Sequence, residues 1–346
     1  MRLKFVFILY VLIFLFDFNM FSQSTCKIFR LNPIFFLREV DSLRNAQKYD
    51  EIEKLLYDRI KSDSVKLWHY YQLACIRSLQ HDTIAPFQLL SKHIDLKVYA
   101  DDILTDTDFE PLHKTLQWKK LRDTLCYCYL LKYPNISDRE LSLALWLQGI
   151  EDQRMRTLKQ NWKKPTPQSG SKEWEAMNKA FRKKTQERAN FVMEYVNRGI
   201  WPTYSMVGED AGNAAMLIIQ HCERNSYLKK TLPLLKVAAE QGEASKIMYV
   251  NMLDRYLLHK NKRQIYGTQI IGERNSKTGS LVMFFSPIED ESNVNERRAA
   301  MNMEPIEEWA KAMGFTYLYR PTSKRLFYFK AYRDARKNGQ HINMKN

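Results

Sequence analysis

The hydrophobic pattern along the 346-residue chain has a helical period over much of its length. Apolar residues recur at three- and four-residue spacing in 141–147, 213–221 and 245–258, which predicts helices. The period then changes to two short β-prone runs, 264–271 and 281–285, separated by a polar segment. These runs predict one β-hairpin whose loop is longer than the tightest type. The expected fold class is therefore mainly α, with one small β-hairpin.

The first 24 residues have the pattern of an export signal. Arg2 and Lys4 precede twelve unbroken apolar residues, 5–16, and Asp17 ends this run before a small polar stretch. This order is typical of a signal peptide. A spanning helix needs about 20 apolar residues, so the run is too short to cross a membrane. We expect an exported protein that is periplasmic, at the cell surface or secreted, with no transmembrane helix after cleavage.

Cleavage of this signal is expected near Gln23 or Ser24, which leaves Thr25 close to the mature N-terminus. A lipoprotein acylated at Cys26 is the less favoured alternative. The residues before Cys26 lack the Leu and the small residues that a lipobox normally supplies.

Residues 30–132 contain a repeat with an offset of 34 residues, at which 47–56 align with 81–90. This period resembles the tetratricopeptide repeat, in which helix pairs bury their apolar faces by stacking on neighbours. Pro86 departs from the pattern, because a proline is tolerated there only in the first turn of a helix. The resemblance implies a protein or peptide partner on a concave face. A packing module without a ligand is the alternative.

Residues 138–314 carry a series of polar motifs and predict a second, α-rich domain that contains the hairpin and a final helix through 303–310. In chain order the motifs are Asp152-Gln153 with Arg156, Gly199 with Trp201-Pro202, Val207-Gly208, Gln220-His221, Asp254-Arg255, Tyr266-Gly-Thr-Gln269, Pro287-Ile-Glu-Asp290 and Arg297-Arg298. They resemble an uncharacterised bacterial family, a domain of unknown function. The resemblance implies domain identity and no particular activity.

His221 and Asp254 are the candidate catalytic residues of this domain. His221 follows Ile218 by three residues, and Asp254 lies in line with Val250, so both point toward the apolar side of their helices. A general base and a carboxylate that orients it form a common catalytic pair. The structural alternative for His221 is a bond to the carbonyls at the helix end. For Asp254 it is an internal ion pair or a bond to the hairpin backbone.

Further polar motif residues are candidate ligand-binding positions, because amides, phenols and guanidiniums hold polar or anionic groups. These candidates are Gln220, Arg255, Tyr266, Thr268, Gln269, Glu289, Asp290, Arg297 and Arg298. Gly267 within this set permits a close approach of the backbone. A glycine bulge in a strand is the alternative explanation.

The charge of the chain favours an anionic partner. Lys and Arg number 54 against 39 Asp and Glu, for a net charge of +15, which attracts anions without determining the fold. The segment 315–346 forms a basic, aromatic C-terminal tail. No recognition motif accompanies the bases, so nucleic acid is an unlikely partner.

The composition and the cysteines exclude several classes of protein. A hydrophobic fraction of 45% with 11 Gly and 11 Pro excludes collagen-like and disordered chains. Cys26, Cys75, Cys126, Cys128 and Cys222 are odd in number and show no paired spacing, which leaves their disulfide status open. The histidines form no metal-binding motif, and we predict neither a metal nor a cofactor.

Two function classes remain. The chain is either a protein- or ligand-binding module of the bacterial cell envelope, or a hydrolase-like envelope enzyme that uses His221 and Asp254 on an anionic substrate. The binding module is favoured, because the sequence has no nucleophile elbow, phosphate loop or metal motif.

Overall fold

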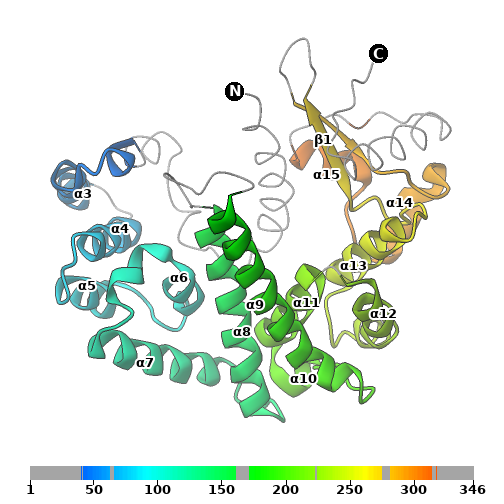
Figure 1. Cartoon of the computed structure of the whole chain (residues 1–346), viewed down its shortest axis with the longest axis horizontal. Coiled ribbons are helices and arrows are strands. Elements are labelled where there is room, and N and C mark those ends of the chain that lie inside the picture. Colours follow the sequence, from blue (N-terminus) through cyan, green and yellow to red (C-terminus); the bar gives the residue numbers. More distant parts are fainter. Residues whose placement is uncertain are drawn as a thin grey trace. The chain divides into compact units, whose positions relative to one another are not determined.

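The structure is a computed structural model that describes residues 40, 42–62, 66–160, 171–222, 224–274, 281–313 and 317. It confirms the expected fold class, since helices dominate and one two-stranded antiparallel sheet is present (Figure 1). The described residues form two compact units. We call them the helical unit, up to residue 183 with 205–214, and the hairpin unit, 184–204 with 215–317. The predicted signal peptide lies outside the described residues.

The helical unit begins with three helices that pack in chain order: α3 (Tyr49–Ser62), α4 (Lys66–Leu79) and α5 (Ala85–His93). Leu56 and Leu90 are fully buried, as the 34-residue alignment requires. Pro86 lies in the first turn of α5, where its missing N–H has no helical partner in any case. The assignment of a tetratricopeptide-like repeat stays a prediction.

The rest of this unit is built on α6 (Ala100–Thr105), the 3-10 helix η2 (Thr107–Leu112), α7 (Leu116–Lys132) and α8 (Arg139–Gln160). The hydroxyl of Thr115 accepts a hydrogen bond from Trp118 N at 3.1 Å and begins α7. Asp138 does the same for α8 through Leu141 N at 2.9 Å, as its position predicts. Because α8 packs on α6, α7 and η2, residues 132–138 lie inside one compact unit.

Two helices, α9 (Lys172–Val196) and α11 (Glu209–Cys222), run from one unit into the other, with the short α10 (Tyr204–Val207) between them. In the hairpin unit, α12 (Asn225–Glu240) packs against α13 (Lys246–His259). The hydroxyl of Ser245 accepts a hydrogen bond from Met248 N at 3.3 Å and begins α13. The helices α11 and α13 confirm the predicted helical stretches 213–221 and 245–258, whereas α12 lies in a segment for which no helix was predicted.

The hairpin consists of β1 (Ile270–Arg274) and β2 (Leu281–Phe285), with Ile270 opposite Phe285. The prediction that the first strand begins at 264 is wrong, because side chains bind the backbone of 264–269 and replace the strand ladder there. Only Gln264 forms a bridge, to Ile288, among the described residues of that segment.

Three short helices follow: the 3-10 helix η3 (Glu291–Asn293), α14 (Val294–Ala300) and α15 (Ile306–Ala312). The predicted final helix over 303–310 begins only at Ile306, since Pro305 is its N-cap residue. Tyr317, which we assigned to the tail, belongs to the core of this unit. Its hydroxyl donates to Glu291 Oε1 at 2.6 Å and its ring contacts Phe285.

These helices and β2 share one apolar core, formed by Phe285, Ile288, Val294, Ile306 and Ala310. It fixes the segment after β2 beside the loop that precedes β1. Within the described part of the chain, no helix is both long and apolar enough to span a bilayer. Among the cysteines of this part, Cys75, Cys126, Cys128 and Cys222, no disulfide is formed.

Candidate functional site

Asp254 on α13 is the centre of the polar motifs in the hairpin unit. Its side chain is fully buried, and its carboxylate accepts hydrogen bonds from three backbone N–H groups: Ile265 at 2.7 Å, Tyr266 at 3.1 Å and Thr268 at 3.1 Å. The hydroxyl of Thr268 donates a further bond at 3.0 Å. Asp254 therefore holds the loop 264–269, which confirms the alternative of a bond to the hairpin backbone.

Burial and hydrogen bonding act on Asp254 in opposite directions. Burial raises the pKa of the carboxyl group, while the bonds from Ile265, Thr268 and Tyr266 lower it. The effect of burial is larger, so the pKa lies above the usual value for aspartate. The cause is the loss of water around the charge, as expected for a fully buried carboxylate.

Gln264 holds the same loop from its other side, and its side chain is also fully buried. Its amide nitrogen donates to the carbonyl oxygens of Gln269 at 2.9 Å and Ser286 at 2.7 Å, and its amide oxygen accepts from Gln269 N at 2.8 Å. Sequence reasoning missed Gln264, because a glutamine in a β-prone run resembles an exposed strand residue. No local pattern distinguishes it.

The two arginines of α14 bind the carbonyl groups of the loop. Arg298 is buried, and its guanidinium donates to Tyr266 O at 2.8 Å and to Glu304 O at 2.6 Å. Burial lowers its pKa to about 10, although the charge of Asp254 raises it in part. Arg297 donates to Ile265 O at 3.0 Å and to the carbonyls of Glu289 and Asp290.

The side chains of the loop make fewer hydrogen bonds than its backbone does. The amide of Gln269 donates to Asn251 Oδ1 at 2.9 Å. Tyr266 is half-buried, and its hydroxyl has no hydrogen-bond partner among the described residues. Burial raises the pKa of Tyr266 and of the buried Tyr249, and the charge of an ionised Tyr266 would raise that of Tyr249 further. Two neighbouring phenol groups thus lie where α13 meets the loop.

The structure brings most of the predicted residues together and leaves others apart. Asp254, Tyr266, Thr268, Gln269, Arg297 and Arg298 form one hydrogen-bonded network, and Arg297 adds the backbone of Glu289 and Asp290. The side chain of Glu289 is exposed, and that of Asp290 accepts from Ser292 and Asn293. The roles predicted for these residues toward a ligand stay predictions.

Gln220 and His221 are buried on α11, and Arg255 is half-buried on α13. The inward position predicted for His221 is confirmed. The bonds of Asp254 all go to residues 265–268, and within the described residues none of them reaches His221. The catalytic roles predicted for His221 and Asp254 stay predictions.

The comparison with known families matches this part of the chain. Residues 151–320 match DUF6624, a family of unknown function. Neither a curated protein nor a solved structure matches the chain. The match confirms an uncharacterised domain that contains the whole loop network.

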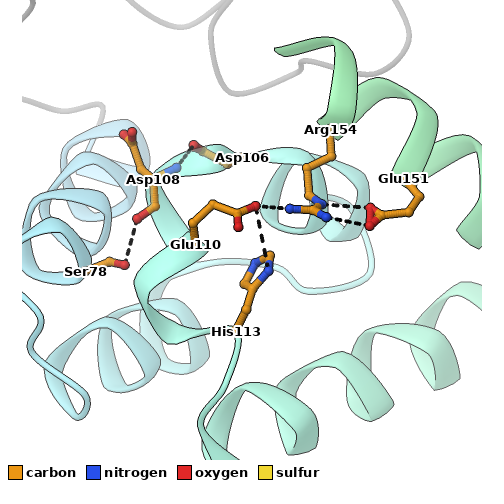
Figure 2. A network of polar contacts seen from close by, with 7 residues as sticks. All are labelled: Ser78, Asp106, Asp108, Glu110, His113, Glu151 and Arg154. Atoms are coloured by element: carbon orange, nitrogen blue, oxygen red, sulfur yellow. Dashed lines mark hydrogen bonds and ion pairs between the residues drawn. The ribbon is translucent and has the colours of Figure 1, made fainter. Parts of the chain in front are cut away.

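A second polar network lies in the helical unit (Figure 2). Arg154 on α8 forms an ion pair with Glu110 of η2, and it donates to both carboxylate oxygens of Glu151, at 2.8 and 2.5 Å. These contacts raise the pKa of Arg154. His113 Nδ1 lies 3.8 Å from the same oxygen of Glu110, and its ring stacks on Trp118. The network joins Arg154 and Glu151, inside the family match, to η2, outside it.

Burial lowers the pKa of His113, which the charge of Glu110 raises in part. Burial thus favours the neutral imidazole, whose ring stacks on Trp118. Sequence reasoning missed this network, since Glu110 and Arg154 are 44 residues apart and carry no shared motif. It ties the packing of η2 to that of α8.

Cys75, Asp106 and Asp108 bring potential metal-ligand atoms within 4.8 Å of one another in the helical unit. These atoms already have partners in the protein. Asp106 accepts bonds from Tyr71 and from the thiol of Cys75, and Asp108 forms an ion pair with Arg44. Burial raises the pKa of Cys75, which opposes the thiolate that a metal requires. The arrangement is therefore that of an internal hydrogen-bond network.

Proposed function

We propose that the protein is an exported cell-envelope protein whose hairpin unit binds a ligand, and that its polar motifs hold the binding surface in shape. The observation that carries this proposal is the saturation of Asp254 by donors from residues 265–268. A carboxylate that orients a catalytic histidine needs an oxygen for the imidazole N–H. Asp254 has none to offer, so a binding role is favoured over the alternative of a His221-dependent hydrolase.

Export is supported by the first 24 residues, with their basic start and twelve apolar positions. Removal of these residues leaves 52 bases and 38 acids, because Arg2, Lys4 and Asp17 are lost from 54 and 39. A mature protein of net charge +14 is suited to the anionic polymers and lipids of an envelope. The helices of residues 49–132 would supply a surface for a protein or peptide partner.

The ligand surface of the hairpin unit is proposed at the half-buried Tyr266, beside Tyr249 of α13, whose ring is buried. Their phenol hydroxyls have no hydrogen-bond partner among the described residues, and the backbone beneath Tyr266 is fixed by Asp254 and Arg298. A phenol on a fixed backbone presents an apolar ring and a polar tip at little entropic cost. Such a pair suits a polar ligand with hydroxyl or anionic groups.

The test is retention of the purified mature protein on an envelope fraction from which lipid has been extracted. Tyr266→Phe and the double variant Tyr249→Phe/Tyr266→Phe each remove hydroxyl groups and keep the rings. We expect the apparent Kd to rise about two- to tenfold for each hydroxyl that bonds the ligand. The melting temperature should not change, since neither hydroxyl has a hydrogen-bond partner among the residues that the structure describes.

Tyr57→Phe in α3 is the matched control, because Tyr57 is an exposed tyrosine in the other unit. It should bind like the wild type. Equal retention of all variants would overturn the proposed ligand surface. Turnover of envelope material that His221→Gln abolishes would replace the proposal with the enzyme alternative.

A further inference from the structure

Helix α7 has apolar residues on two opposite sides. Trp118, Leu121, Leu125 and Tyr129 are buried and face the helical unit. Leu116, Tyr127 and Leu131 are 64%, 63% and 45% exposed. Because each residue advances about 100° around a helix, Tyr127 lies about 20° and Leu131 about 60° from Leu116. The three exposed side chains therefore lie within one arc of about 60°, which we call the outer stripe, opposite the buried face. Two exposed polar residues, Lys120 and Asp123, lie on the same face between Leu116 and Tyr127.

The outer stripe is more apolar than a solvated helix face usually is. A surface helix normally carries polar residues opposite its buried side. Three large exposed apolar side chains on one side of a helix mark an interaction surface more often than single exposed residues do. The stripe extends from Leu116 to Leu131, which is 15 residue steps or about 22 Å along the helix axis.

Basic residues flank this stripe. Residues 114–132 contain the bases Lys114, Lys119, Lys120, Arg122 and Lys132 against the single acid Asp123, a sum of +4. Lys132 pairs with Asp210 at 2.5 Å. Lys119 and Lys120 are exposed and form no ion pair with any described residue. Without Lys132, four bases and one acid remain near the stripe, a sum of +3.

We propose that α7 binds an anionic lipid surface through its outer stripe, lying parallel to the membrane. Leu116, Tyr127 and Leu131 would enter the headgroup boundary, while Lys119 and Lys120 would bind lipid phosphates. Apolar side chains with a tyrosine and flanking lysines are the composition that favours such interfacial binding. This proposal concerns the helical unit and does not depend on the ligand site at Tyr266.

Two other occupants fit the stripe less well. A second copy of the chain would bring two basic helices together, and like charges oppose that contact. A helical peptide binds in a hydrophobic groove formed between elements, whereas the outer stripe is the ridge of one helix. Anionic lipid satisfies both the charge and the shape.

The experiment is co-sedimentation of the mature protein with lipid vesicles. We expect binding to vesicles that combine phosphatidylcholine with phosphatidylglycerol, and little binding to phosphatidylcholine alone. The triple variant Leu116→Ser/Tyr127→Ser/Leu131→Ser should reduce the partition coefficient about tenfold or more, because it removes the apolar contribution. Lys119→Glu/Lys120→Glu should weaken binding at low salt. The difference from the wild type should decrease as added salt screens the charges.

Tyr57→Ser/Ile84→Ser is the matched control, since both residues are exposed and apolar but lie on other parts of the helical unit. It should bind like the wild type, and circular dichroism should show that all variants are folded. Absent binding by the wild type, equal binding to neutral vesicles, or unchanged binding by the triple variant would overturn the proposal. So would lipid-independent self-association that the triple variant abolishes. Binding that depends on the basic tail at 315–346 would leave the triple variant unchanged and count against α7.

Discussion

At the scale of single residues, the polar motifs of the hairpin unit bind the peptide backbone. Asp254 and Gln264 accept hydrogen bonds from N–H groups of the loop, while Arg297 and Arg298 donate hydrogen bonds to its carbonyl oxygens. A loop outside a regular ladder must satisfy its buried backbone groups in another way. These side chains do so, which explains why charged and amide residues lie within an apolar unit.

Replacing Gln264 tests this role. Gln264→Leu keeps a similar volume but leaves Gln269 N, Gln269 O and Ser286 O without their side-chain partner. We expect the free energy of unfolding to fall by about 2–4 kcal/mol, because buried groups lose their hydrogen bonds. Urea unfolding measures the loss. The control Gln241→Leu changes an exposed residue at the end of α12, and a comparable loss there would disprove the role.

The raised pKa of Asp254 predicts a dependence of stability on pH. The folded protein holds this proton more tightly than the unfolded chain does, so the group stabilises the fold fully below the unfolded carboxyl pKa of about 3.9. That contribution is lost as the pH rises through the folded pKa. The variant Asp254→Asn has no titratable group at this position. The free energy of unfolding of the wild type minus that of Asp254→Asn should therefore decrease with rising pH.

Urea unfolding of both proteins between about pH 4 and pH 7 measures this difference. An increase with pH would mean that the hydrogen bonds outweigh burial, and that the pKa of Asp254 is lowered in the fold.

At the scale of elements, helices were predictable and the loop was not. The period of apolar residues predicted α8, α11 and α13, and the side chains of Asp138 and Ser245 cap the starts of α8 and α13. The β-prone composition of 264–269 suggested a strand. Its true structure depends on Asp254 and Gln264, which compete with the strand ladder through tertiary contacts that no local pattern records.

Gly267 within this loop offers a matched pair of variants. Gly267 and Gly242 both have positive φ, +69° and +77°, and both lose that freedom on substitution. A Cβ at Gly267 would lie 2.6 Å from Ile306 Cδ1, whereas a Cβ at Gly242 meets nothing within 4 Å. We expect Gly242→Ala to cost about 1 kcal/mol and Gly267→Ala about 1–3 kcal/mol more. Equal losses in thermal unfolding would show that the loop does not pack on α15.

The helices α3 and α5 allow a test of the 34-residue alignment. The alignment makes Leu56 and Leu90 equivalent, and both are fully buried, so truncation of either to Ala should cost about 2–5 kcal/mol. Val98→Ala, at a residue that is 40% exposed, should cost less than about 0.5 kcal/mol. A loss below about 1 kcal/mol at both leucines would make the alignment coincidental.

At the scale of the whole molecule, two compact units carry separate proposals. The hairpin unit presents Tyr266 on a loop that Asp254 holds in place, and the helical unit presents the outer stripe of α7. The residue types in the sequence were enough to identify the polar motif residues as a candidate site. They could not distinguish a catalytic pair from a backbone anchor, because that difference lies in where the oxygens of Asp254 are directed.

The most direct test of this account compares Asp254→Asn with Tyr266→Phe in the mature protein, by urea unfolding and by retention on lipid-free envelope material. We expect Asp254→Asn to lose about 2–3 kcal/mol of stability at neutral pH, because an amide cannot accept all the donors of the loop. Tyr266→Phe should keep its stability and bind more weakly. A stable Asp254→Asn variant that loses turnover of envelope material, beside a Tyr266→Phe variant that binds normally, would contradict the account.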